Sequence, residues 1–170
     1  MSSRAPEPVR ASVTVSLAGP EAFALFAEGF GNWWPREYTW SLDVLQRIGL
    51  EPHAGGRCYE IGPHDFHSDW GRVLVWDPPH RLQLAWQISP RREPEPNPAK
   101  ASEVEARFEP IAGGGTQVLL EHRGFERHGS EGAGYRDALG SPQGWPWILE
   151  RYAAAAANQR ISRQAGVGRV

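Results

Sequence analysis

His122 is the polar residue of this sequence with the clearest potential for acid–base chemistry. It closes a run in which Thr116, Val118, Leu120 and His122 occupy alternate positions, the period-2 pattern of a strand with one buried face. Its imidazole should therefore point into the protein, where it could orient a ligand or transfer a proton near neutral pH. The alternative is a core histidine hydrogen-bonded to a backbone carbonyl or to a tryptophan N–H.

A second group of polar residues, His64, Asp65, His67 and Asp69, contains side chains that bind metal ions. His64 and His67 could approach one ion, and Asp69 could join them. The run follows Gly62-Pro63, however, and polar residues are expected in such a turn whether or not they bind a metal. A zinc site also needs further ligands and a shielding outer shell. We therefore predict no metal site and no cofactor.

Tryptophan is unusually frequent, with eight in 170 residues. Such a load favours either a large aromatic core or the wall of an apolar pocket, and the sequence does not separate the two. The residues that we expect to line a pocket are Trp33, Trp34, Trp40, Tyr59, Trp86, His122, Trp145, Ile148, Leu149 and Tyr152.

No motif of the sequence specifies a reaction. It contains neither a Gly-x-Ser-x-Gly elbow for a nucleophilic serine nor a glycine-rich phosphate loop followed by Lys and Ser/Thr. Cys58 is the one cysteine, and no obvious base lies beside it in the sequence, so we expect it to be inert. The catalytic residues of any enzyme built on this chain therefore stay unknown.

Composition and charge narrow the class of protein. The net charge is -2 with both signs interspersed, so no footprint for nucleic acid is visible. The first ten residues lack the apolar core of a signal peptide, and the alanine run 153–157 is far shorter than the ~20 residues that span a bilayer. One cysteine forms no intrachain disulfide. These features predict a cytoplasmic protein without nucleic-acid or membrane partners.

The rest of the chain supplies the elements that must position these residues. Alternation from Val9 to Leu17 predicts a first strand, and a short helix over 21–28 follows Pro20. A second short helical piece or turn holds 33–35. We expect further strands over 42–50, with Val44, Ile48 and Leu50 inward, and over 57–61, 103–109 and 116–122. Residues 91–100 are expected to form an exposed loop without structure of its own, and the glycine-rich, polar residues 124–140 a long connection.

The stretch 70–86 predicts a hairpin that turns at Asp77-Pro78-Pro79-His80. Leu82, Leu84 and Trp86 share one parity, but the first strand carries apolar residues of both parities. If Val73 and Val75 face inward, then Trp70, Leu74 and Trp76 form an exposed apolar stripe that would suit a homodimer or partner contact. With the opposite parity, they form the wall of the cavity.

A long amphipathic helix should end the domain. Its apolar stripe has i, i+3, i+4, i+7 and i+11 spacing: Trp145, Ile148, Leu149, Tyr152 and Ala156. Runs of strands bracketed by helices favour an α+β fold with a mostly antiparallel sheet, which this helix would cover. We expect one domain over residues 8–158, with flexible tails at 1–7 and 162–170.

Several segments in this order carry a family resemblance: Phe26…Trp33-Trp34-Pro35, Gly55-Gly56-Arg57, Trp70-Gly71-Arg72-Val73 with Pro78-Pro79…Arg81-Leu82…Trp86, Gly115-Thr116-x-Val118-x-Leu120-Glu121-His122-Arg123-Gly124, and Gly144-Trp145…Leu149. With these segments the chain resembles the START-like (SRPBCC) superfamily, and within it the bacterial AHSA1-like proteins related to the activator of Hsp90 ATPase. The resemblance implies a helix-grip fold, in which a curved antiparallel sheet wraps around a long C-terminal helix, with two short helices after the first strand.

The resemblance also implies a cavity between sheet and helix that binds a small hydrophobic molecule in many members. That is the first hypothesis for function. The second is a cyclase- or lyase-type enzyme, which should place at least two polar groups in the cavity, such as His122 with Tyr59, Glu60 or Asp69. The third, ranked last, is a regulator of an Hsp90-type chaperone ATPase, because the eukaryotic activators carry a separate N-terminal domain for which this chain has no room.

Overall fold

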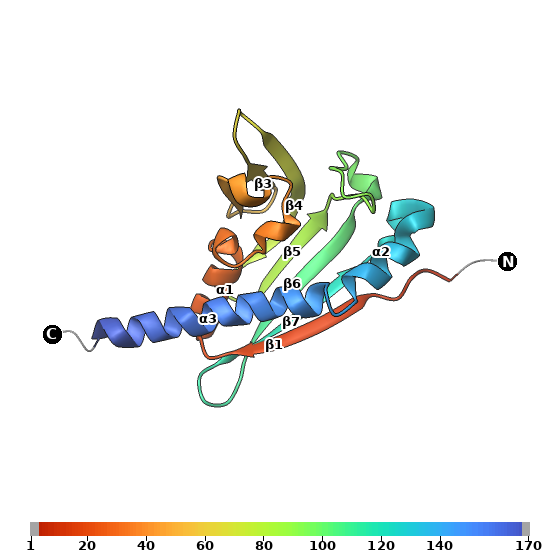
Figure 1. Ribbon diagram of the computed structural model, residues 1–170. Coiled ribbons are helices and arrows are strands. Elements are labelled where there is room, and N and C mark those ends of the chain that lie inside the picture. Colours follow the sequence, from red (N-terminus) through yellow and green to blue (C-terminus); the bar gives the residue numbers. More distant parts are fainter. Residues whose placement is uncertain (1–3, 168–170) are drawn as a thin grey trace.

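A single antiparallel sheet organises the chain (Figure 1). The computed structural model describes residues 4–167, and within them the sheet has seven strands in the order β1-β7-β6-β5-β4-β3-β2. The strands are β1 (Val9–Val15), β2 (Arg47–Leu50), β3 (Arg57–Ile61), β4 (His67–Asp77), β5 (Arg81–Trp86), β6 (Ser102–Pro110) and β7 (Thr116–Arg123). All neighbouring pairs are antiparallel.

The helices cover one face of this sheet (Figure 1). The α-helices are α1 (Gly19–Ala27), α2 (Gly132–Leu139) and α3 (Trp145–Val167). Short 3₁₀ turns are η1 (Phe30–Asn32), η2 (Arg36–Tyr38), η3 (Leu42–Val44), η4 (Pro98–Lys100) and η5 (Phe125–Glu131). Helix α3 lies across the sheet, and the Tyr152 hydroxyl donates to the Ala22 carbonyl at 2.7 Å, which ties α3 to α1. The expected α+β helix-grip fold is confirmed.

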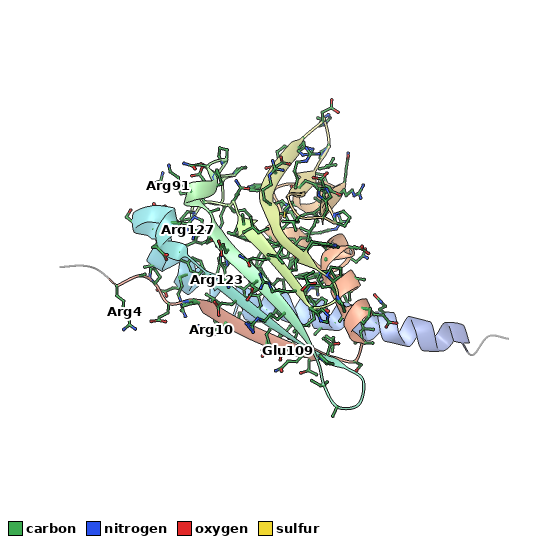
Figure 2. All side chains as sticks on the ribbon, turned by 180° about the vertical axis from the view of Figure 1, so that it is seen from behind. Arg4, Arg10, Arg91, Glu109, Arg123 and Arg127 are labelled. Atoms are coloured by element: carbon green, nitrogen blue, oxygen red, sulfur yellow. The ribbon has the colours of Figure 1, made fainter. Side chains whose placement is uncertain are left out.

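The opposite face of the sheet carries paired charges (Figure 2). Arg10 lies 3.1 Å from Glu121 across the β1–β7 pair. Arg123 contacts Glu103, Glu105 and Glu121 at 3.3–3.6 Å. Because this face is polar and the helix-covered face is apolar, each strand alternates, which is why alternation in the sequence located β1, β6 and β7.

Two bulges in β4 resolve the ambiguous parity of the hairpin. Cys58 pairs with Gly71 but Tyr59 with Asp69, which leaves Trp70 as an extra residue. Val73 pairs with Leu84 and Val75 with Gln83, which leaves Leu74 as another. Each extra residue reverses the parity that follows it.

Trp70 and Trp76 consequently both turn toward the helix-covered face. Trp70 is buried, and the partly buried ring of Trp76 packs edge-on against Phe23 at 5.1 Å. Leu74 alone is exposed. The continuous apolar stripe considered for a dimer contact therefore does not form, although a homodimer through another surface stays a prediction.

The expected strand over 42–50 is wrong in its first half. Leu42 to Val44 form the turn η3, and Leu42 has a left-handed φ of 49°. Val44 is exposed rather than inward, whereas Ile48 and Leu50 are buried as expected. The backbone N–H groups of residues 40 and 41 bond to a buried carboxyl group instead of to a neighbouring strand, so the ladder begins only at Arg47.

Two segments expected to be loops contain structure. Residues 125–139 form η5 and α2, because Phe125, Tyr135 and Leu139 are buried and outweigh the glycines of that stretch. Residues 88–94 close a turn through an Ile88–Pro94 bridge. Helix α3 also continues to Val167, past residue 162, where we expected a tail; residues 1–3 and 168–170 lie outside the described part of the chain.

Candidate functional site

A cavity of about 500 Å³ opens between β2–β5, the 34–41 segment, the 88–94 turn, the end of α2 and the start of α3. Its apolar lining residues are Trp34, Trp40, Ile48, Trp70, Trp86, Ile88, Ala138, Leu139 and Ile148. Its polar lining residues are Glu37, Tyr38, Thr39, Glu60, Arg92, Ser141 and Gln143. The volume and the mainly apolar lining are those of a small-molecule site.

Three tryptophans form a preorganised wall in this cavity. Trp34 and Trp70 are nearly parallel, with their ring planes 14° apart and their centroids 6.4 Å apart. Trp86 stands against both, at 6.1 Å from Trp34 and 5.7 Å from Trp70. Phe30 stacks behind Trp34 at 4.9 Å and holds it in place. Aromatic pairs at these distances stabilise each other, so the wall is rigid before any ligand arrives.

Hydrogen bonds lock two further parts of the lining. The Trp86 indole N–H donates to the Tyr135 hydroxyl at 2.7 Å, and that hydroxyl donates to the Ile88 carbonyl at 2.9 Å. The Trp40 indole N–H donates to the Arg92 carbonyl at 2.8 Å. The Arg92 guanidinium lies 5.0 Å from the centre of the Tyr135 ring, a cation–π contact. These bonds join β5, α2 and the 88–94 turn around one opening.

Glu60 is a fully buried carboxyl group in the lining, with 1% of its surface exposed. It accepts the Trp40 N–H at 3.1 Å, and the Ser41 N–H and hydroxyl, both at 2.8 Å. All three bonds go to residues 40 and 41 of the 34–41 segment, the mouth segment, which borders the cavity. Glu60 therefore fixes that segment in place, and most of its hydrogen-bonding capacity is already used.

His122 lies outside the cavity, behind Trp86 and Trp145. Its Nδ1 accepts the Trp145 indole N–H at 3.0 Å, and its Nε2 lies 2.7 Å from the Ser102 hydroxyl, which in turn lies 2.7 Å from His128 Nε2. Burial, with a smaller contribution from His128, holds the pKa of His122 well below its usual value. The ring is therefore neutral, and because an indole only donates, His122 must donate from Nε2. It is the core histidine of the alternative reading, bonded to a tryptophan.

Of the ten residues expected to line a pocket, Trp34, Trp40, Trp86 and Ile148 lie on this cavity. The other six, which the cavity does not reach, are Trp33, Tyr59, His122, Trp145, Leu149 and Tyr152. Trp33 and Tyr152 are enclosed by α1 and α3, where the Trp33 indole donates to the Leu25 and Phe26 carbonyls. Tyr59 is half-buried and packs against His67 instead.

Several lining residues absent from the expected set belong to segments whose structure the sequence does not reveal. Leu139 belongs to α2 and Arg92 to the 88–94 turn, both expected to be unstructured. The alternation in 70–76 leaves open which face of the sheet Trp70 occupies, so it does not place Trp70 in the cavity. For Ile48, the expected inward direction of its side chain is the signal that could have placed it in the lining.

The possible metal ligands do not assemble. His67 Nε2 lies 2.8 Å from Asp69 Oδ1, an exposed pair near a hairpin turn. Among the described residues, no group of three or more His, Cys, Asp or Glu side chains could hold a metal ion. The described helices include none that is long and apolar enough to cross a bilayer. Cys58 is fully buried, and burial raises the pKa of its thiol, which agrees with an inert cysteine.

The chain is similar to a protein family and to several solved structures. Residues 24–157 match the model of the family described as Activator of Hsp90 ATPase homolog 1-like protein. Txn09, an anthrahydroquino-γ-pyrone synthase, is 34% identical over 89% of this chain and 97% of its own, with a TM-score of 0.63. CalC of Micromonospora echinospora, a self-sacrificing resistance protein, is 31% identical over 91% and 96%, with a TM-score of 0.64.

More distant structures share the fold alone. NE0264 of Nitrosomonas europaea is 12% identical over 91% of this chain and 96% of its own, with a TM-score of 0.63. A search of curated proteins gave no match. The family model covers well over half of the chain, and the Txn09 and CalC structures exceed 30% identity. The chain therefore belongs to the Activator of Hsp90 ATPase homolog 1-like family.

Proposed function

We propose that this protein binds a planar, largely apolar small molecule in the cavity between the sheet and α3. The observation that carries the proposal is the wall of Trp34, Trp70 and Trp86, which faces about 500 Å³ of open space. A rigid aromatic wall lowers the entropic cost of binding a flat ligand, because no side chain has to be ordered first.

The polar groups of the cavity favour binding over catalysis. The residues considered as a catalytic set, His122, Tyr59 and Asp69, lie away from it, and Glu60 is occupied by the mouth segment. The Tyr38 hydroxyl donates to the Gln143 carbonyl at 2.7 Å, so its proton is already engaged within the protein. The cavity therefore provides an apolar surface of defined shape and a few polar groups that could hold a ligand.

A cyclase-type enzyme is the second candidate, supported by the 34% identity to a synthase. The resistance protein at 31% identity supports a role in sequestering a molecule instead. Prolonged incubation with a bound aromatic ketone, followed by chromatography and mass spectrometry, separates the two: a binding protein returns the compound unchanged. Regulation of an Hsp90-type ATPase ranks third, and an unchanged ATPase rate in the presence of this protein would remove it.

The binding test uses tryptophan fluorescence, since the lining carries four of the eight tryptophans. Titration with a panel of tricyclic aromatic compounds should quench the emission with saturable curves. Ile148→Trp should abolish saturation by filling the cavity, whereas Leu74→Trp adds the same ring at an exposed position outside it and should not.

One combined result would overturn the proposal: no compound of the panel changes the emission, and native mass spectrometry of gently purified protein finds no bound molecule.

A further inference from the structure

Arg92 has an unusual backbone conformation for its residue type. Its φ is 64°, in the left-handed region that residues other than glycine seldom adopt. The other described residues of this kind, Leu42, His64 and Asp65, do not line the cavity, whereas Arg92 does. Side chains held in such conformations cluster at ligand clamps and other functional sites, where the surrounding structure maintains the strain. The backbone of Arg92 therefore points to a role at the cavity.

Hydrogen bonds of the 88–94 turn fix this conformation. The Arg92 N–H donates to the Ser89 carbonyl at 2.9 Å, and the Ser89 N–H donates to the Glu93 carbonyl at 2.8 Å. The Arg92 carbonyl accepts the Trp40 indole N–H at 2.8 Å, which joins the turn to the mouth segment. Since both polar groups of its backbone are bonded, the side chain of Arg92 starts from a defined point beside the cavity.

The guanidinium of Arg92 lies next to residues of the lining. It is 5.0 Å from the centre of the Tyr135 ring, and the Tyr135 hydroxyl is bonded to Trp86 and Ile88, which both line the cavity. Burial raises the pKa of that hydroxyl, while the Trp86 hydrogen bond and the charge of Arg92 act in the opposite direction. The guanidinium is thus close to the edge of Trp86. Because Arg92 is also exposed, a ligand can reach its N–H groups.

Arg92 keeps its charge available to a ligand. The adjacent Arg91 pairs with Glu131 at 3.3 Å, whereas Arg92 has no carboxylate partner among the described residues. It is also the one cation among the described residues of the lining. Of the two lining carboxylates, Glu60 accepts three hydrogen bonds from the mouth segment, and the charge of Glu37 is exposed and screened by water.

We propose that Arg92 determines ligand specificity, and that the ligand is a flat aromatic compound with a carboxylate at its edge. The inference rests on the proposed function and deepens it, because it names the charged group of the ligand. A guanidinium offers two parallel N–H donors that match the two oxygens of a carboxylate. The rings occupy the apolar interior, and the carboxylate stays at the opening, where both Arg92 and water solvate it.

Anthracene-2-carboxylate and 2-nitroanthracene test the inference, because they share one flat tricyclic skeleton and the nitro group is a neutral group with the shape of a carboxylate. The ratio of their two dissociation constants reports the effect of the charge, and its change in a variant isolates the contribution of Arg92. Arg92→Gln should weaken binding of the carboxylate about fivefold, the upper value for an ion pair that water still reaches, and leave binding of the nitro compound nearly unchanged.

Arg91→Gln is the matched control. It removes the same charge from the neighbouring residue of the same turn, but Arg91 does not line the cavity and pairs with Glu131, so the ratio should persist. If Arg92→Gln merely disturbs the turn, both compounds should bind more weakly and the ratio should not change. Ionic strength gives a second measurement on the wild type, because added salt should weaken binding of the carboxylate relative to the nitro compound.

The outcomes separate the role of Arg92 from the binding function. A ratio that Arg92→Gln leaves unchanged, that Arg91→Gln changes equally, or that salt does not shift would overturn the role of Arg92 and leave the binding function standing. If the wild type binds neither compound nor any other member of the tricyclic panel, the proposed function fails and the inference fails with it.

Discussion

Two groups of aromatic residues lie side by side under the sheet and differ in what covers them. The first, the closed cluster, consists of Phe23, Phe26, Trp33, Phe108 and Tyr152. The second consists of the cavity wall, Trp34, Trp70 and Trp86, together with Trp40, which also lines the cavity. Both are built from aromatic residues, yet only the second faces open space.

The covering elements explain the difference. Helix α1 and the middle of α3 lie over the closed cluster, and the Tyr152 hydroxyl joins these two helices. The cavity wall is covered by the 34–41 segment, the connection from α2 to α3 and the Trp145 ring at the start of α3. The 34–41 segment and the connection meet through the Tyr38–Gln143 bond, and open space remains beside the wall. Every indole N–H and phenol O–H of the closed cluster has a partner, whereas the wall keeps the free donor of Trp70. Burial alone therefore does not distinguish core from site.

Phe26→Ala should have the largest effect on stability. The ring contacts Trp33, Phe108 and Tyr152 at 5.0–5.5 Å and is enclosed on all sides, so truncation leaves an empty hole. We expect the free energy of unfolding in urea to fall by about 4 kcal/mol. Phe26→Leu, which refills most of the volume, should cost clearly less. A loss below about 1 kcal/mol for Phe26→Ala would show that the cluster is not closed.

Glu60→Ala should have the next largest effect. It leaves the Trp40 and Ser41 N–H groups and the Ser41 hydroxyl without their acceptor, and we expect a loss of about 3 kcal/mol in unfolding free energy. The mouth segment should loosen as well, seen as faster amide exchange at residues 40 and 41. Glu60→Gln keeps one acceptor oxygen and should recover part of both effects. If Ala and Gln behave alike, the hydrogen bonds do not hold the mouth.

Trp40→Ala probes the wall itself and should cost only about 2 kcal/mol, although it removes a larger side chain than Phe26→Ala does. Trp40 is half-buried and borders existing open space, so its removal enlarges the cavity and creates no new sealed void. The affinity for a tricyclic ligand should fall more than the stability does, as measured by quenching of the remaining tryptophans. A stability loss equal to that of Phe26→Ala would erase the distinction between the two groups.

The sequence predicted the fold better than the site, for a physical reason. Strands with one covered face repeat every two residues, so β1, β6 and β7 were readable. The bulges at Trp70 and Leu74 shift parity without any mark in composition, and only the pairing partners on β3 and β5 show them. Helix α2 was missed because its glycines suggest a loop, whereas the burial of Tyr135 and Leu139 holds the helix.

Of the seven Trp and Tyr residues expected to line a pocket, four lie away from this cavity, for a different reason. Residue type and spacing identify Trp33, Trp34 and Tyr152 as inward, and all three are buried. Whether an inward ring meets another ring or open space depends on where α1 and the 34–41 segment end, which is a property of the tertiary arrangement. Likewise, the parity of His122 correctly gave its direction, but Trp86 and Trp145 lie between it and the cavity.

Protonation of His122 should have the smallest effect on the free energy of unfolding. It tests whether water reaches the residues that lie behind Trp86 and Trp145. Its pKa in the fold is lowered well below the usual 6.5, first by burial and then by His128. Above pH 6.5 neither the folded nor the unfolded state binds a proton there, so stability is unaffected. Below 6.5 the unfolded chain takes up a proton that the native ring refuses, and stability falls by up to ~1.4 kcal/mol per pH unit until the folded pKa is reached.

Urea unfolding between pH 7.5 and 5.5 measures this slope. His122→Gln should be less stable at pH 7.5, because the Trp145 N–H loses its nitrogen acceptor, but its stability should fall less steeply with pH. The difference in unfolding free energy between the wild type and His122→Gln should therefore be about 1.4 kcal/mol smaller at pH 5.5 than at pH 7.5. Parallel curves would mean that His122 protonates freely in the native state. Water would then reach it past Trp86 and Trp145, and the cavity wall would be open on both sides.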